Sequence, residues 1–370
     1  MTGSQLNKSF LWARDDHQGW NYTTYFSFFN DFTREDDDMK YVEMAAITLL
    51  CTISFILNSA LITFFLYSKE LRTRQHMFTV SVLFSSIFLL PFSMLIGITR
   101  LSDDGWMFGD LVCKSTLFSF LATSFIKIWL MSLISIDRYL TVVHLPDRQL
   151  GQRSSILLTI AAWALPVISL AAIVFPNTTS VQVKLPNNTT VGICSAMFRY
   201  HPTIKFSLLY FSILFTVEYL LPAIVMTVSY SKIMEKIKNS SQALIRHSKR
   251  TPLANDETVK SLKKTSKERR TTVILISILI LFLLMWSPLF GLLAWLSLDQ
   301  WLQTYRMTSR FVIGNLCVLI ANTIIEPVLF SLTTGQVRQK IATICKKYRL
   351  GRTITVAPLS RAEQTLETVG

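Results

Sequence analysis

The sequence predicts an all-α integral membrane protein, a bundle of seven transmembrane helices followed by a short amphipathic helix. Hydrophobic residues make up 51% of the 370-residue chain and charged residues only 16%, which is too little polar surface for a soluble protein of this size. The apolar residues gather in seven continuous runs of about 20 residues or more, the length that crosses a bilayer. Because the runs are continuous and do not alternate, they indicate helices, not barrel strands.

The elements follow in chain order. Residues 1–40 are expected to form a glycosylated extracellular segment, and the first span is expected to act as its own insertion signal. The bundle covers residues 41–334, residues 335–348 form the amphipathic helix, and residues 349–370 are a disordered tail. The predicted spans are residues 42–67, 76–99, 110–136, 154–175, 203–230, 271–296 and 309–332.

Positive charge in the loops predicts the orientation. Twenty-five of the 37 lysines and arginines lie on the side of the C-terminus, twelve of them within residues 231–270. Lysine and arginine accumulate on the cytoplasmic side, so the C-terminus is expected inside and the N-terminus outside, at the plasma membrane. The net charge of +14 then reflects topology and attraction to anionic membrane lipids, not nucleic-acid binding.

Sequons and cysteines agree with this orientation. Cys113 and Cys194 are the only cysteines expected in the oxidising exterior, so they should form a disulfide. Cys345, in the basic stretch after the last span, is a predicted palmitoylation site. The N-glycosylation sites expected on the outer side are Asn7, Asn21, Asn177, Asn187 and Asn188.

No nucleophile–base motif, phosphate-binding loop, internal repeat or metal-ligand spacing is visible in the sequence, so neither an enzyme nor a cofactor or metal site is expected. Motifs of another kind are spread along residues 41–348. They are Asn58, Trp106 before Cys113, Asp137-Arg138-Tyr139, Trp163, Pro222 with Tyr230, Phe282 with Trp286 and Pro288, and Asn322 with Pro327. In this combination and order, the chain resembles a rhodopsin-like (class A) G-protein-coupled receptor.

The resemblance implies that an external ligand shifts an inactive–active equilibrium and opens a cytoplasmic cleft to a heterotrimeric G protein. Arg138 is then held by Asp137 and by Glu268 in the inactive state, and it meets Tyr230 in the active state. A solvated charge is the alternative for Glu268. The family places the switch at Asp137, Arg138, Tyr139, Tyr230, Glu268 and Pro327, with Phe330 here in place of a tyrosine.

The chain departs from the family where helices 2, 3 and 7 normally bind sodium. Ser86 stands where the family has a helix 2 aspartate, Lys127 replaces a serine, and Glu326 replaces the asparagine before Pro327. Lys127 lies about 16 Å from Arg138 along the helix, too deep to reach either surface. We therefore expect an internal Lys127–Glu326 ion pair that replaces the sodium. A neutral lysine in a hydrated cavity and a protonated glutamate are the alternatives.

The expected ligand pocket is aromatic and aliphatic. Glu218, a third intramembrane acid, either faces a cationic ligand group or is a protonated or water-solvated acid bonded to a neighbouring helix, and neither interpretation is favoured. Basic residues such as Arg100 rim the outer mouth, where they either meet an anionic ligand or are ordinary solvated charges. The pocket residues expected from the resemblance are Phe120, Thr123, Ser124, Glu218, Trp286, Leu289, Phe290 and Leu293.

A peptide is the favoured ligand, because an acidic run at residues 34–38 beside several aromatic residues would steer a basic peptide by long-range attraction. A lipid-like or anionic small molecule is the alternative. Phosphorylated hydroxyls in the C-terminal tail are candidate contacts for arrestin. A non-signalling or constitutively active receptor also remains open because of Phe330. A transporter or channel would explain the buried charges but leaves the Asp137-Arg138-Tyr139 triplet unexplained.

Overall fold

The structure is a computed structural model. It describes residues 8–10, 39–68, 74–102, 104–144, 150–184, 190–199, 206–250, 256–298 and 309–333, together with residues 337, 339 and 343. Within these ranges seven helical segments are long and apolar enough to cross a membrane. The predicted seven-helix fold is therefore confirmed. The predicted amphipathic helix and tail lie almost entirely outside the described residues.

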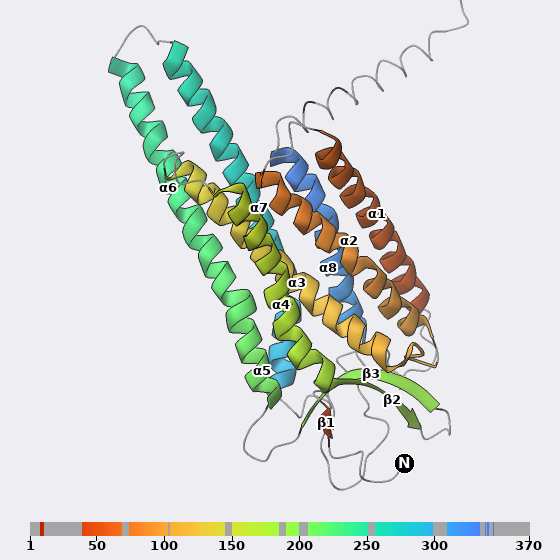
Figure 1. Cartoon of the computed structure of the whole chain (residues 1–370). Helices are drawn as coiled ribbons and strands as arrows, with labels where there is room; N and C mark the ends of the chain where they lie inside the picture. The colour runs from red at the N-terminus through yellow and green to blue at the C-terminus, as the bar shows by residue number, and fades with distance from the viewer. Residues whose placement is uncertain are drawn as a thin grey trace, which may run out of the picture.

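Every span except the fifth is a single helix (Figure 1). The fifth span is interrupted, because a six-residue π-helical turn, η4, lies between α5 and α6. The helical bounds are α1 Met39–Tyr67, α2 Arg74–Leu101, α3 Gly109–Val142, α4 Gln152–Asn177, α5 Phe206–Leu214, η4 Phe215–Leu220, α6 Leu221–Arg250, α7 Asp256–Leu298 and α8 Ser309–Thr333.

Helix α3 is the central element of the bundle. Every residue from Ala122 to Ile128 is buried, which covers all faces of the helix over nearly two turns. A helix that is enclosed on every side can carry polar side chains only where neighbouring helices supply partners for them. The middle of α3 is therefore where the candidate site is expected.

A small sheet, which the sequence did not predict, covers one end of the bundle (Figure 1). The strands β2 (Thr178–Lys184) and β3 (Thr190–Arg199) form an antiparallel hairpin, and β1 (Lys8–Phe10) pairs with β3. The hairpin is fixed to α3 by the predicted disulfide between Cys113 and Cys194. This end of the molecule corresponds to the predicted exterior.

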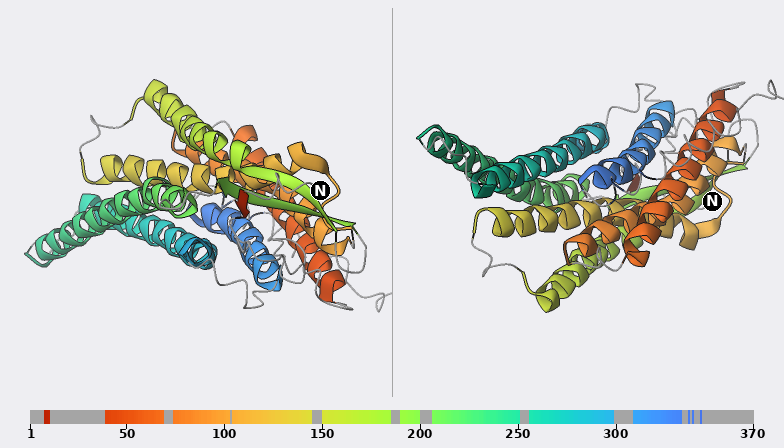
Figure 2. Two further views of the ribbon diagram at one scale, coloured as in Figure 1. Left: turned by 90° about the horizontal axis from the view of Figure 1, so that it is seen from below. Right: turned by 90° about the horizontal axis from the view of Figure 1, so that it is seen from above.

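At the opposite end, α6 and α7 extend well beyond the other helices and lie together to one side of the bundle (Figures 1 and 2). Residues 231–250 and 256–270, expected from the sequence to be a loop between two spans, are helical. The reason is local, because these ranges contain no glycine or proline and are rich in lysine and arginine, which accept the helical conformation readily.

Candidate functional site

The centre of the bundle holds a buried ion pair between α3 and α8. The Lys127 ammonium nitrogen Nζ lies 2.9 Å from Glu326 Oε2 and 3.2 Å from Oε1. Each of the two side chains is only 1% exposed. The pairing expected from the sequence is thus present in the geometry, and it joins residues that are 199 positions apart in the chain.

Two neutral donors complete the surroundings of the Glu326 carboxylate. Ser86 of α2 donates to Oε2 at 2.8 Å, and Asn322, one turn earlier on α8, donates to Oε1 at 3.0 Å. Each carboxylate oxygen therefore accepts two hydrogen bonds. Such a pair in a low-dielectric interior is stable only when the remaining lone pairs are satisfied in this way. One carboxylate consequently ties α2, α3 and α8 together.

A second polar network continues from this site toward α1. Asn58 of α1 donates to the carbonyl oxygen of Thr323 at 2.8 Å, and the hydroxyls of Ser54 and Thr323 are 2.6 Å apart. Thr323 lies three residues before Glu326, on the same segment of α8. The two networks together bind four helices through buried hydrogen bonds, which are well isolated from competition with water.

The expected ligand-pocket residues on α3 and α7 form an aromatic cluster. The Phe120 ring lies 6.2 Å from Trp286, and Trp286 lies 6.4 Å from Phe290, measured between centroids. The hydroxyls of Thr123 and Ser124 donate to carbonyl oxygens of α3 itself, at 2.8 and 2.6 Å. The two hydroxyl hydrogens are therefore already used within α3, and the two residues contribute mainly packing surface to the pocket. The side chains of Leu289 and Leu293 lie outside the described part of the structure.

Glu218 is placed between helices, the second of the two arrangements foreseen from the sequence. Its Oε2 accepts a hydrogen bond from the Trp129 indole nitrogen at 2.6 Å, and its Oε1 lies 3.0 Å from the Ser169 hydroxyl. The side chain thus lies against α3 and α4. Sequence reasoning missed both partners, because a tryptophan and a serine in apolar spans carry no signal that distinguishes them from ordinary packing residues.

Arg100, expected at the outer rim, already has an acidic partner. Its Nε lies 2.8 Å from Glu43 Oε2 of α1, and the arginine side chain is 3% exposed. The pair closes the outer ends of α1 and α2, so Arg100 is not an open site for an anionic ligand. The sequence held one indication of this pair, because Glu43 is an acid at the predicted outer end of the first span.

At the other end of α3, Arg138 lies close enough to Tyr230 of α6 and to His76 of α2 for its charge to act on both. Tyr139 contacts His144 through its hydroxyl at 3.2 Å. Both Arg138 and Glu268 lie in described segments, and no ion pair within 4 Å joins them there. The latch between these two residues stays a prediction.

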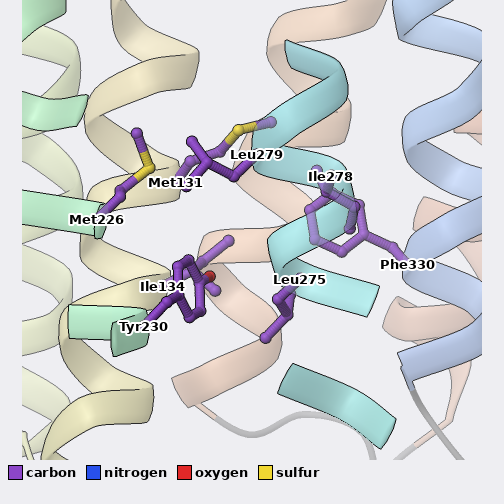
Figure 3. Close-up of a pocket in the computed structure, with 8 residues that line it drawn as sticks. All are labelled: Met131, Ile134, Met226, Tyr230, Leu275, Ile278, Leu279 and Phe330. Carbon is purple, nitrogen blue, oxygen red and sulfur yellow. The ribbon is translucent and has the colours of Figure 1, made fainter. Parts of the chain in front are cut away.

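Phe330 and Tyr230 line one small cavity between α3, α6, α7 and α8 (Figure 3). Its volume is about 10 Å³, close to the space that one water molecule needs. Phe330 follows Pro327 by three residues and presents an apolar ring where a tyrosine would present a hydroxyl. The cavity lining is mostly apolar, consisting of Met131, Ile134, Met226, Tyr230, Leu275, Ile278, Leu279 and Phe330.

Few of the predicted modification sites fall within the described residues. Asn177 closes α4, and its side-chain amide donates to the Ile173 carbonyl oxygen at 2.7 Å. Its glycosylation stays a prediction. The other predicted sites lie outside the described residues, namely Asn7, Asn21, Asn187, Asn188 and Cys345.

Comparisons with known proteins agree with this architecture. The family model described as "7 transmembrane receptor (rhodopsin family)" matches residues 57–330. The mouse (Mus musculus) Substance-P receptor is 20% identical over 297 residues, which cover 80% of this chain and 68% of that protein. Neuropeptide receptor 22 of Caenorhabditis elegans is 26% identical over 262 residues, covering 68% and 57%. Bombesin receptor subtype-3 of sheep (Ovis aries) is 25% identical over 289 residues, covering 76% and 66%.

Among solved structures, squid rhodopsin superposes with a TM-score of 0.69 at 22% sequence identity. The match covers 90% of this chain and 91% of the squid protein. At that level of identity the likeness concerns the fold, and it shows that the helices described above have the arrangement of a seven-helix receptor bundle.

Proposed function

The chain belongs to the rhodopsin family of seven-transmembrane receptors, and from this premise we propose that it transmits an extracellular peptide signal to a heterotrimeric G protein. The protein is a multi-pass membrane receptor, not an enzyme. The observation that supports G-protein coupling most directly is the Asp137-Arg138-Tyr139 triplet near the end of α3. The charge of Arg138 lies close enough to Tyr230 to influence it electrostatically. In the plasma membrane the sheet would face outside and the extended ends of α6 and α7 inside.

A peptide ligand is supported by the relatives, since the Substance-P, neuropeptide and bombesin receptors are all named for peptides. The acidic run at residues 34–38 supports a basic peptide in particular. A lipid-like or anionic small molecule remains the second candidate, because the Phe120–Trp286–Phe290 cluster is aromatic. The Arg100–Glu43 pair weakens the anionic form of that candidate, since it removes a cation from the rim.

Replacing Arg138 with alanine is expected to abolish G-protein activation while leaving surface expression near the wild-type level. Arg138 is the cation that the family uses to contact the G protein, and it is only partly buried, so its loss leaves no cavity in the core. Receptor-stimulated GTP exchange on each G-protein family, with basal cAMP, is the measurement. Arg153→Ala is the matched control, because Arg153 is an exposed arginine in the first turn of α4. This change should leave G-protein activation unaltered.

The outcome of this experiment also separates signalling from scavenging. The proposed function is supported if the wild type stimulates GTP exchange, with or without ligand, and Arg138→Ala does not. A wild type that stimulates no G protein, with unchanged internalisation in the alanine variant, would favour a non-signalling receptor. Arrestin recruitment needs a separate binding assay, and we expect it to depend on phosphorylation of the C-terminal tail.

We further propose that the Lys127 ammonium occupies the place that sodium takes in relatives. The Lys127 ammonium already supplies the counter-charge of Glu326. A sodium ion at the same carboxylate would be repelled by this ammonium. Basal activity and thermal stability are therefore expected to be the same in sodium chloride and in choline chloride at equal ionic strength. A sodium-dependent rise in melting temperature in the wild type, absent in Glu326→Gln, would contradict this replacement.

A further inference from the structure

The fifth span changes its helical register at Glu218. Pro222 has no backbone N–H, so it cannot bond the carbonyl oxygen four residues earlier, which belongs to Glu218. The chain responds with the π-helical turn η4, in which the Leu221 N–H donates to the Thr216 carbonyl oxygen, five residues back. Single π turns of this kind often mark functional positions. Here the turn places an acidic side chain in the interior of the membrane span.

Glu218 is buried without a cation. Its side chain is 4% exposed. Trp129, its partner on α3, lies two residues beyond Lys127 and roughly 13 Å along the helix from Arg138. Within the described segments, no lysine, arginine or histidine nitrogen lies within 4 Å of the carboxyl group. An ionised carboxylate at this depth would cost several kcal/mol without a counter-ion.

The charged and titratable groups on α3, α4 and η4 do not supply the missing counter-ion for Glu218. On α3 the nearest cation is Lys127, and its ammonium is bound to Glu326. On α4 the single charged residue is Arg153, in the first turn of the helix. On η4 the other titratable group is Tyr219, whose hydroxyl lies 3.5 Å from the Leu283 carbonyl oxygen on α7. None of these groups supplies a positive charge at the carboxyl group.

The hydrogen bonds around the carboxyl group are compatible with a neutral, protonated Glu218. The Ser169 hydroxyl has one hydrogen but two acceptors within reach, the Pro166 carbonyl oxygen at 3.2 Å and Glu218 Oε1 at 3.0 Å. If Oε1 is protonated, it donates to the Ser169 oxygen, and the Ser169 hydroxyl donates to Pro166. Oε2 then accepts from the Trp129 indole. Every polar hydrogen in the group has one acceptor, as buried groups require.

The opposite side of the same turn contacts α7. The Tyr219 ring lies 4.4 Å from Phe290 and the Phe215 ring lies 5.8 Å from it, between centroids. Phe290 belongs to the cluster that contains Trp286. Glu218 therefore joins η4 to α3 and α4, while Tyr219 and Phe215 join the same turn to α7.

We propose that Glu218 is a proton-carrying positioning residue, whose neutral carboxyl group holds the π turn so that Tyr219 and Phe215 meet Phe290 of α7. The proposal needs neither the peptide ligand nor G-protein coupling, so it can be tested independently of both.

Infrared spectroscopy of the purified receptor in lipid nanodiscs tests the proton directly. At neutral pH, the difference between wild type and Glu218→Gln should contain the carbonyl band of a neutral carboxylic acid, shifted by deuterium exchange. Glu235→Gln is the matched control, because Glu235 is an exposed acid on α6 paired with Lys232, and its loss should remove carboxylate bands only. If Glu218→Gln also removes only carboxylate bands, the proposal is wrong.

Thermal unfolding tests the positioning role. Glutamine matches the neutral acid, since its carbonyl oxygen accepts from Trp129 and its amide donates to Ser169, so Glu218→Gln should retain wild-type expression. Glu218→Ala removes both contacts and should lower expression several-fold. A glutamine variant whose melting temperature falls as far as that of Glu218→Ala would overturn the proposal.

Discussion

Lys127→Met and Glu326→Gln, each made alone, are expected to reduce surface expression and thermal stability far more than the two changes made together. Either single change leaves one charge without its partner at a site where each side chain is only 1% exposed. Breaking a buried pair in this way costs about 3–5 kcal/mol. Removing both charges exchanges an ion pair for two neutral side chains of similar length, which is close to neutral in free energy.

The measurements are surface expression by antibody binding, the melting temperature of the purified receptor, and basal GTP exchange for all four genotypes. The chain provides a matched control in the exposed pair of Lys232 and Glu235, with side chains 58% and 60% exposed. The same substitutions there should be almost silent, because exposed ion pairs contribute little. Silent single changes at the buried site, or a double variant as damaged as either single one, would show that the pair does not hold the bundle together.

The same pair shows why part of this site could be predicted from sequence. A lysine in the middle of an apolar span is so costly that it must meet an acid at the same depth. The resemblance to rhodopsin-like receptors places Glu326 in the same polar pocket as Lys127, so the pairing follows from the cost of a buried charge and from the resemblance together. Cys113 and Cys194 were predictable for an equally restrictive reason, since the oxidising side of the membrane held no other cysteine to pair with.

Other contacts depend on rotations about helix axes that no spacing in the sequence reveals. Glu218 was recognised as an intramembrane acid, but whether it faced a ligand pocket or α4 depended on the π turn, which changes the register of everything before it. The pairing of Arg100 with Glu43 likewise depends on how α1 packs against α2. The helical extensions of α6 and α7 were missed because a basic, polar stretch predicts a loop after a membrane span, although its residues favour a helix.

Gly192→Ala is expected to disrupt the end of the receptor that carries the sheet. The effect follows from backbone contacts alone. The Gly192 N–H donates to the Asp104 carbonyl oxygen at 2.9 Å, and the Trp106 N–H donates to the Gly192 carbonyl oxygen at 2.9 Å. A Cβ atom at residue 192 would lie 2.9 Å from the Trp106 carbonyl carbon and closer still to its oxygen. No side-chain rotation relieves a clash with a neighbouring backbone, so the first outer loop must separate from β3.

The separation matters because Cys194 follows two residues later and must reach Cys113. Overpacking of this kind costs about 1–3 kcal/mol, and failure to close the disulfide would add about 2–5 kcal/mol. Gly192→Ala should therefore lower surface expression and raise the fraction of receptor with maleimide-reactive thiols. Gly314→Ala, in α8, is the control, because a Cβ there meets no atom within 4 Å. Full expression of Gly192→Ala with no free thiol would mean that the loop and the hairpin assemble without this contact.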